Sequence, residues 1–315
     1  MGEALRFVEV GPRDGFQNWP DPVSTEIKEG LVRDLLGAGV ETVEATSFVS
    51  PKWVPQMADA EDLMRRLGPE LHPRLRVLVP NLRGYERAVA AGARSVVVNV
   101  GATEGFNRKN LNRGVEETVS EIVAVCAAAA GAGVEVAGSL SVAWGCPYDG
   151  PVGQERAMAV ARRLLEAGCD RLSIADTIGV ANPESVATLC RAAVAEFGSE
   201  RVAVHFHDTR GLGVANVLTA LESGVREFEG SIGGIGGCPF APRSTGNVCS
   251  EDLLHMLELI GFAVGARVQR LLEIAASLAE TLGKPLPGKL HRAGLEPWVV
   301  AEGAGRAQAP PSTAG

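Results

Sequence analysis

Short apolar runs rich in valine and isoleucine alternate along the chain with longer alanine- and leucine-rich segments whose apolar positions follow a helical period. Several longer segments end in glycine just before the next apolar run, as in the GAGV sequences at 37–40 and 131–134. Glycine readily adopts the left-handed conformation that ends many helices. The pattern predicts strands at 7–11, 41–47, 74–80, 95–100, 135–142, 171–177, 201–208 and 227–233. It predicts helices near 25–37, 54–67, 83–91, 115–131, 154–167, 183–197, 211–223 and 250–260.

This succession of strand-plus-helix units favours an α/β fold of the (β/α)8 TIM-barrel type, with parallel strands at the centre and helices outside. An open doubly wound sheet is the alternative, but the GxGxxG sequence of a dinucleotide-binding turn is missing after the first strand. Residues 264–298 predict additional C-terminal helices packed on the barrel. We therefore expect a single catalytic domain over 1–298 and a disordered tail at 299–315, which is rich in alanine, glycine and proline.

Composition narrows the class of protein. The formal net charge of -8 and the pI near 5.3 argue against nucleic acid as a partner. No apolar run reaches the roughly 18 residues of a membrane span, and the first 30 residues lack the apolar core of a signal peptide. We expect a cytoplasmic protein that does not bind membranes. The six cysteines lack CxxC spacing, which favours reduced thiols.

Candidate metal ligands lie where predicted strands end. His205 and His207 are two residues apart in the seventh strand, so both side chains can point into the barrel mouth. A divalent ion such as Mg²⁺ or Mn²⁺ also prefers oxygen ligands, which Asp14 after the first strand and Asn247 after the eighth can supply. The alternative is a pair of hydrogen-bonded core histidines. An aspartate at another strand end favours the metal site.

Three further residues are candidates for catalysis. Arg13, beside Asp14, is suited to stabilising an anionic oxygen. Glu44 could hold that arginine, or it could be a charge inside the barrel with a structural partner. Cys238 lies in the glycine-rich sequence GGIGGCPF, which predicts a loop able to close over a ligand. A thiol on such a loop is a candidate proton donor.

Six segments stand out along the chain from about residue 7 to 262: VEVGPRDGFQN, VEATSFVSPKWVPQMAD, GCPYDG, DTIGVANP, HFHDTRG and GGIGGCPFAPRSTGN. Together they resemble the 3-hydroxy-3-methylglutaryl-CoA lyase family, whose members are metal-dependent TIM-barrel lyases. The resemblance implies retro-Claisen cleavage of 3-hydroxy-3-methylglutaryl-CoA to acetyl-CoA and acetoacetate, a place in leucine degradation, and a homodimer.

The resemblance also implies a role for each candidate residue. Metal ligation falls on Asp14, His205, His207 and Asn247, contact with a substrate oxygen on Arg13, support of that arginine on Glu44, and the acid thiol on Cys238. The base that removes the hydroxyl proton stays open between Asp14, His205 and a metal-bound hydroxide.

The chain departs from the family on the fifth strand. Ala137 and Ser139 stand where the family usually has arginine and tyrosine, which opens space and removes polar contacts in the mouth. Asn99 and the segment 104–110, expected on a loop that faces substrate, also differ. Alternatives are therefore a lyase for a related 3-hydroxy-3-substituted acyl-CoA such as citramalyl-CoA, a Claisen-type synthase, or a noncatalytic acyl-CoA-binding barrel.

Overall fold

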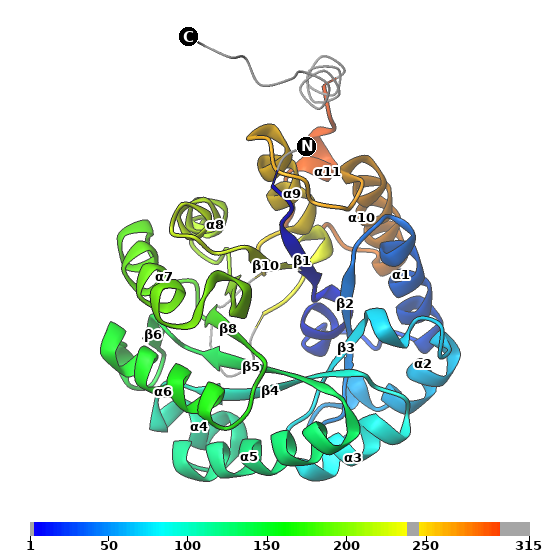
Figure 1. Ribbon diagram of the computed structural model, residues 1–315. Coiled ribbons are helices and arrows are strands. Elements are labelled where there is room, and N and C mark those ends of the chain that lie inside the picture. Colours follow the sequence, from blue (N-terminus) through cyan, green and yellow to red (C-terminus); the bar gives the residue numbers. More distant parts are fainter. Residues whose placement is uncertain (1–2, 238–245, 297–315) are drawn as a thin grey trace.

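The computed structural model describes residues 3–237 and 246–296 and contains a closed barrel of parallel strands surrounded by helices (Figure 1). The order of strands around the barrel is β1-β10-β9-β8-β5-β4-β3-β2. This arrangement confirms the predicted TIM barrel. The strands are β1 (Arg6–Glu9), β2 (Thr42–Ser47), β3 (Leu75–Leu78), β4 (Ser95–Gly101), β5 (Glu135–Ser141), β8 (Arg171–Asp176), β9 (Val202–Phe206) and β10 (Glu227–Gly230).

Helices follow the strands, and the predicted glycine stops have the expected conformation. Gly39 follows the first helix with a φ of 101°, and Gly133 follows the helix before β5 with a φ of 64°. The predicted C-terminal helices are present as α10 and α11. The helices are α1 (Thr25–Gly37), α2 (Ala60–Leu67), α3 (Leu82–Ala90), α4 (Glu104–Leu111), α5 (Val115–Ala132), α6 (Gln154–Glu166), α7 (Pro183–Phe197), α8 (Gly213–Glu222), α9 (Ser250–Leu259), α10 (Val268–Leu282) and α11 (Leu290–Ala293).

Three sequence predictions were wrong in detail. The segment 104–110 is not a loop but belongs to α4, because Thr103 caps its first turn (Phe106 N to Thr103 Oγ1, 3.4 Å) and Phe106 is buried. Asn99 lies within strand β4, which agrees with the strand predicted at 95–100 and not with the loop on which Asn99 was also expected. The helix predicted at 54–67 begins only at Ala60, after a separate 3₁₀ turn at Pro55–Met57.

A small two-stranded sheet, β6 (Gly145–Cys146) with β7 (Gly150–Pro151), was not predicted. The predicted tail at 299–315 lies outside the described residues. No helix within 3–237 and 246–296 combines the length and hydrophobicity needed to cross a bilayer.

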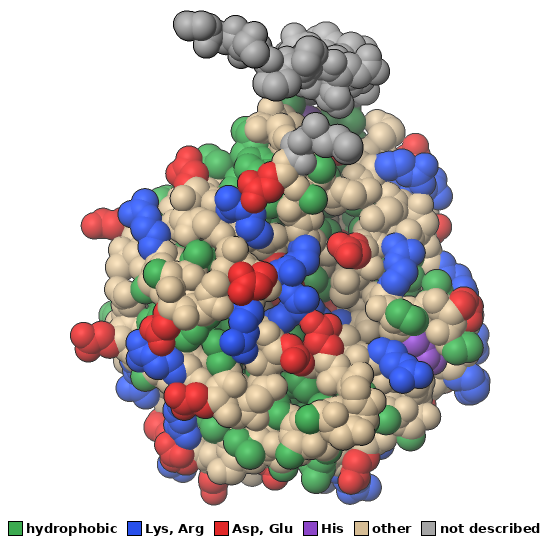
Figure 2. All heavy atoms as spheres, viewed as in Figure 1, with side chains coloured by type: hydrophobic (Ala, Val, Ile, Leu, Met, Phe, Trp, Pro, Cys, Tyr) green, Lys and Arg blue, Asp and Glu red, His purple; other side chains and the backbone are tan. Residues whose placement is uncertain are grey.

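Ion pairs fill the amino-terminal end of the barrel. Glu227 of β10 pairs with Arg6 of β1 at 2.8 Å and with Arg171 of β8 at 3.1 Å. Arg76 of β3 lies 3.5 Å from Glu227 and 3.7 Å from Glu229. Acidic and basic side chains also gather at the centre of the face drawn in Figure 2. With this end occupied by paired charges, the carboxyl-terminal ends of the strands, where TIM-barrel enzymes carry their chemistry, form the other end.

Candidate active site

A tight turn after β1 brings the first two candidate residues into the mouth. Gly11–Gly15 (η1) forms one turn of π-helix, and the carbonyl of Val10 accepts hydrogen bonds from the backbone N–H groups of Arg13 (3.1 Å) and Asp14 (2.7 Å). Pro12 suits the start of this turn because it has no N–H to satisfy there. The turn frees Arg13 and Asp14 from the alternation of a strand, so both side chains reach the same region.

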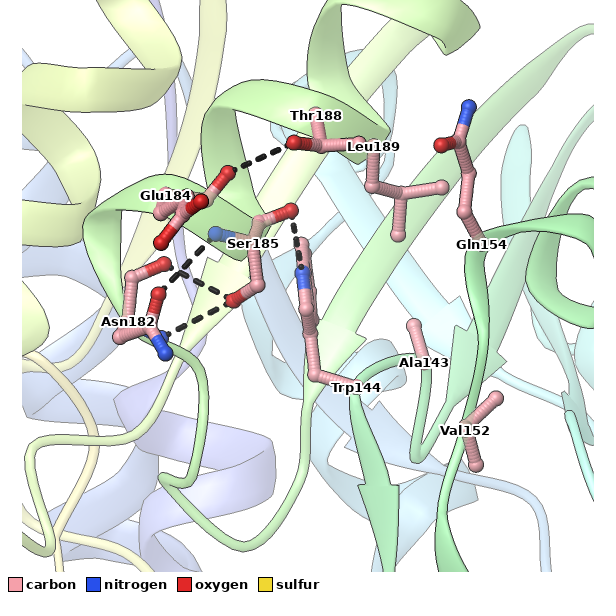
Figure 3. Close-up of a pocket in the computed structure, with 9 residues that line it drawn as sticks. All are labelled: Ala143, Trp144, Val152, Gln154, Asn182, Glu184, Ser185, Thr188 and Leu189. Carbon is pink, nitrogen blue, oxygen red and sulfur yellow. Dashed lines mark hydrogen bonds between the residues drawn. The ribbon is translucent and has the colours of Figure 1, made fainter.

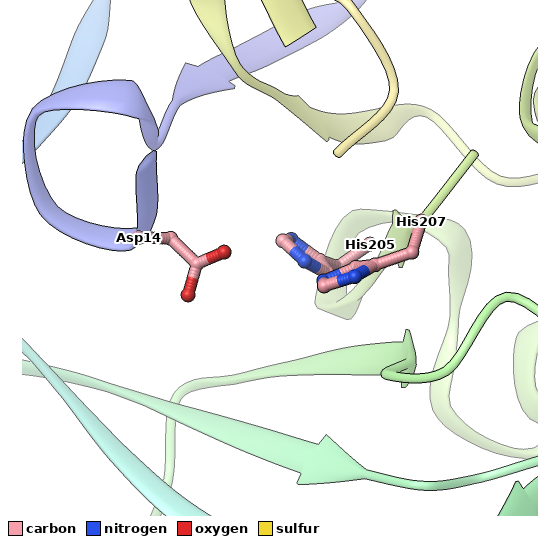
Figure 4. Close-up of side chains that lie close together, drawn as sticks. All are labelled: Asp14, His205 and His207. Carbon is pink, nitrogen blue, oxygen red and sulfur yellow. The ribbon is translucent and has the colours of Figure 1, made fainter. Parts of the chain in front are cut away.

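Asp14, His205 and His207 converge as the sequence predicted. One ligand atom from each residue lies within 4.8 Å of the others, and the Asp14 carboxylate points toward the two imidazoles in Figure 4. The imidazole centroids are 5.1 Å apart. His205 belongs to β9, and both histidines are buried. Two nitrogens and one carboxylate in this arrangement are suited to a single divalent ion.

Asn247 completes the cluster and leaves one atom unused. Its Nδ2 donates to Asp14 Oδ2 (2.9 Å) and to the carbonyl of Ile235 (3.1 Å). Its Oδ1 is buried and accepts no hydrogen bond from the described residues. Gly236 allows this approach, because a Cβ there would lie 2.4 Å from Asn247 Nδ2 and its φ of 143° disfavours other residues. An unused amide oxygen beside a carboxylate and two imidazoles fits the donor set of a divalent metal.

Arg13 is held by two carboxylates. Its Nε donates to Glu44 of β2, and its Nη1 donates to Asp14 Oδ1 at 2.6 Å. Nη2 makes no hydrogen bond with any residue in 3–237 or 246–296, so this nitrogen is available to a ligand. Burial opposes ionisation of Asp14, but Arg13 and the two histidines outweigh it and lower the pKa of Asp14 to about 2. Asp14 is therefore anionic at neutral pH.

Glu229 is a site residue that sequence reasoning missed. Its carboxylate lies 3.1 Å from His205 Nδ1, which leaves Nε2 as the ring nitrogen free to meet a metal. Burial alone would lower the pKa of His205, but Glu229 outweighs burial and raises it. Burial, reinforced by His205, lowers the pKa of His207 to about 3, so His207 is neutral, as a metal ligand must be. The sequence signal that could have identified Glu229 is the alternation Glu227-Phe228-Glu229, which puts two acids on the inward face of the strand next to the histidines.

A second buried acid, Glu9, joins the two loops of the site. Its carboxylate accepts hydrogen bonds from Gly11 N (2.7 Å), Ile232 N (2.9 Å) and Ser250 Oγ (2.5 Å). Gly11 begins the turn that carries Arg13 and Asp14, and Ile232 begins the glycine-rich segment that leads toward residue 238. Glu9 therefore fixes both segments relative to β1. Cys238 itself lies outside the described residues.

Replacing Glu9 with glutamine should flatten the pH dependence of stability. Burial raises the pKa of Glu9 to about 8, against 4.5 for the model group, so the folded protein retains a proton that the unfolded chain releases. The free energy of unfolding of the natural protein should therefore fall as pH rises from about 4.5 to about 8. Urea denaturation across this range measures the effect, with exposed Glu184→Gln as control. Parallel curves for Glu9→Gln and the natural protein would contradict it.

A pocket of about 300 Å³ lies apart from these residues (Figure 3). Trp144 lines it and donates its indole N–H to the carbonyl of Ser185 (3.1 Å). Asn182 and Ser185 use their side chains to cap the start of α7. These two polar side chains of the pocket thus serve helix capping, and none of the predicted site residues lines it. Asp176 at the end of β8 likewise binds backbone N–H groups, those of Val180 (3.0 Å) and Ala181 (2.9 Å).

Comparison with known proteins gives a consistent result. The model of the HMGL-like family matches residues 4–278. A hydroxymethylglutaryl-CoA lyase of Pseudomonas mevalonii is 40% identical over 293 residues, which cover 93% of this chain and 96% of the relative. The mitochondrial hydroxymethylglutaryl-CoA lyase of Homo sapiens is 41% identical, over 93% of this chain and 90% of its own.

Solved structures agree. The structure of an HMG-CoA lyase from Acinetobacter baumannii in complex with coenzyme A and 3-methylmalate has a TM-score of 0.89, with 34% identity over 93% of this chain and 97% of that one. An HMG-CoA lyase from Pseudomonas aeruginosa has a TM-score of 0.88 with 38% identity, over 96% of this chain and 99% of that one. In sequence, fold and extent, the chain belongs to the HMGL-like family.

Proposed function

We propose that this protein is a divalent-metal-dependent carbon–carbon lyase that cleaves 3-hydroxy-3-methylglutaryl-CoA to acetyl-CoA and acetoacetate. The observation that carries the proposal is the convergence of Asp14, His205 and His207, with the unused oxygen of Asn247 beside them. The named activity of the relatives and the coenzyme A bound in the A. baumannii structure support a thioester substrate.

The reaction breaks the bond between C2 and C3 of the acyl group. The C3 hydroxyl loses its proton and becomes the ketone of acetoacetate, while the bonding electron pair passes to C2 and the thioester carbonyl as an enolate. A divalent ion, when bound by Asp14, His205, His207 and Asn247, would acidify a hydroxyl by binding its oxygen. C2 then takes up a proton to give acetyl-CoA.

The residues around the cluster are suited to this charge movement. Arg13 keeps Nη2 free while Glu44 holds Nε and Asp14 holds Nη1, so it can donate a hydrogen bond to the enolate oxygen without first reorganising. Asp14 stays anionic at neutral pH because its pKa is about 2. Glu229 fixes the orientation of the His205 ring.

Acetyl-CoA release tests the proposal directly. The purified protein, treated with chelator and then supplied with Mg²⁺ or Mn²⁺, should release acetyl-CoA from 3-hydroxy-3-methylglutaryl-CoA, and renewed chelation should abolish release. Citramalyl-CoA in the same assay tests the related lyase. Acetyl-CoA consumption with a keto acid would instead indicate a Claisen-type synthase, and binding of coenzyme A thioesters without turnover would indicate a binding protein.

Cys238→Ala should lower turnover by about 10²-fold or more, the usual scale for loss of a general acid, and leave metal affinity nearly unchanged. The reason is that we assign Cys238 to protonation of C2 and not to metal ligation. Turnover of acetyl-CoA formation and Mn²⁺ binding, followed by the paramagnetic signal of the free ion, measure the two quantities. Buried Cys190→Ala is the matched control. A large loss of Mn²⁺ affinity in Cys238→Ala would show that the thiol is misassigned.

The choice between Mg²⁺ and Mn²⁺, the homodimer, the cytoplasmic location and the place in leucine degradation stay predictions from the sequence and its resemblance.

A further inference from the structure

Two buried thiols lie close together between the helices and the wall of the barrel. Cys126 belongs to α5, and Cys169 lies in the turn between α6 and β8. Both are free thiols, and their sulfurs are 3.8 Å apart, so either thiol can donate a hydrogen bond to the other. Among the described cysteines, no other two sulfurs make such a contact. This pair is therefore the place where the described fold can join two thiols.

The turn that carries Cys169 is held in place by hydrogen bonds on both sides. The N–H of Cys169 donates to the carbonyl of Leu164 in α6 (3.1 Å), and its carbonyl accepts from Arg201 Nη2 (3.1 Å). The next residue, Asp170, exchanges two hydrogen bonds of 2.8 Å with the backbone of Val136 in β5. These bonds hold the Cys169 sulfur beside α5 before any reaction takes place.

A small movement would convert the two thiols into a disulfide. The bond between the sulfurs of a disulfide is about 2.05 Å long, so the two sulfurs must approach each other by roughly 2 Å. The backbone is already close, because a Cβ added at Gly168 would lie only 3.1 Å from the Cβ of Cys126. Rotation of either cysteine side chain about its Cα–Cβ bond moves the sulfur over this range while the backbone stays in place.

The contact also makes Cys126 the better nucleophile of the two. The hydrogen bond from Cys169 lowers the pKa of the Cys126 thiol and outweighs burial, which acts in the opposite direction. The same hydrogen bond, together with burial, raises the pKa of Cys169. Because the thiolate is the form that attacks an oxidant, Cys126 reacts first.

We propose that Cys126 and Cys169 form a reversible disulfide that stabilises the protein in the presence of a hydroperoxide. The Cys126 sulfur attacks one oxygen of the hydroperoxide, the O–O bond breaks, and an alcohol leaves, or water when the oxidant is hydrogen peroxide. This step gives a sulfenic acid at Cys126. The Cys169 sulfur then attacks the sulfenic sulfur, the S–S bond forms, and water leaves with the proton of the second thiol. Two electrons thus pass from the two sulfurs to the peroxide.

The disulfide stabilises because it joins two elements 43 residues apart in the chain. A crosslink of this span restricts the unfolded chain, whereas the folded chain already holds the two residues together. Cys169 precedes the amino-terminal end of β8, opposite the mouth, and neither α5 nor this turn contributes a residue to the candidate active site. The proposal therefore concerns stability and is independent of the lyase function.

Peptide mapping tests for the crosslink. The reduced full-length protein is treated briefly with hydrogen peroxide, the remaining thiols are alkylated, and the digested protein is analysed by mass spectrometry. We expect a pair of joined peptides that contain Cys126 and Cys169, lighter by two hydrogens than the two reduced peptides, which dithiothreitol separates. The Tm should rise by about 5 °C on oxidation and return to its first value on reduction.

Cys190→Ser is the matched control, because burial raises the pKa of Cys190 to about 12 and no described thiol contacts it. This variant should form the crosslink and show the same rise in Tm, whereas Cys126→Ser should lose both. Treated natural protein in which Cys126 and Cys169 stay reduced, or pair with other cysteines, overturns the proposal. That measurement needs no variant, so the result stands even if Cys126→Ser does not fold. A crosslink without a rise in Tm overturns the stabilising role.

Discussion

Replacing Asp14 with asparagine should lower the affinity for a divalent ion by about 10³-fold and abolish measurable turnover, the scale expected when one partner is removed from a buried group of charges. Asparagine preserves the shape of the side chain and can still accept a hydrogen bond from Arg13, so the turn after β1 should keep its structure. What disappears is the negative charge that lies within 4.8 Å of the two histidine nitrogens. Calorimetric titration with Mn²⁺ and circular dichroism separate lost binding from lost folding.

Asp208→Asn is the matched control for that experiment. Asp208 directly follows His207, yet its carboxylate accepts from Gly213 N (2.8 Å) and pairs with Lys289 (3.1 Å), outside the cluster. It should bind Mn²⁺ like the natural protein. Unchanged Mn²⁺ affinity in Asp14→Asn would remove Asp14 from the metal site and leave the two histidines without the anionic ligand that the site requires.

The fold was predictable because its signals are local and repeated. Valine-rich strands bounded by glycines such as Gly39 and Gly133 recur along the chain, and the barrel closes from their number and order. Boundaries were less predictable where a side chain decides them. Thr103, for example, caps the first turn of α4 where the sequence predicted a loop.

The metal cluster was predictable in part because side chains alternate between the two faces of a strand. This alternation alone puts His205 and His207 on the same face, whereas the prediction for Asp14 also required the first and seventh strands to come close in a closed barrel. Glu229 was missed because an acid in a strand interior gives no hint of its partner. That partner, His205, comes from a neighbouring strand 24 residues earlier, and only the register of β10 on β9 brings the two together.

The role of Glu9 could not be predicted for a related reason. Its three partners, Gly11, Ile232 and Ser250, belong to three different segments, and none of these contacts is visible in the sequence around residue 9.

Arg13→Lys should lower kcat by about 10²- to 10³-fold, the usual cost of losing one donor to a developing oxyanion, while Mn²⁺ affinity and KM change by less than about 10-fold. The substitution keeps the positive charge but loses the planar guanidinium, whose Nε contacts Glu44, whose Nη1 contacts Asp14 and whose Nη2 is left for the substrate. Stopped-flow measurement of acetyl-CoA formation with saturating Mn²⁺ gives kcat. The control is Arg210→Lys, which changes an arginine bound to backbone carbonyls of the loop after β8.

Because Arg13→Lys retains the charge, a turnover equal to that of the natural protein would mean that electrostatic attraction alone suffices and that the fixed orientation of the guanidinium plays no part. A fall in kcat that Glu44→Gln reproduces in weaker form, with Mn²⁺ affinity unchanged, would instead tie the rate to the orientation that Glu44 imposes on Arg13.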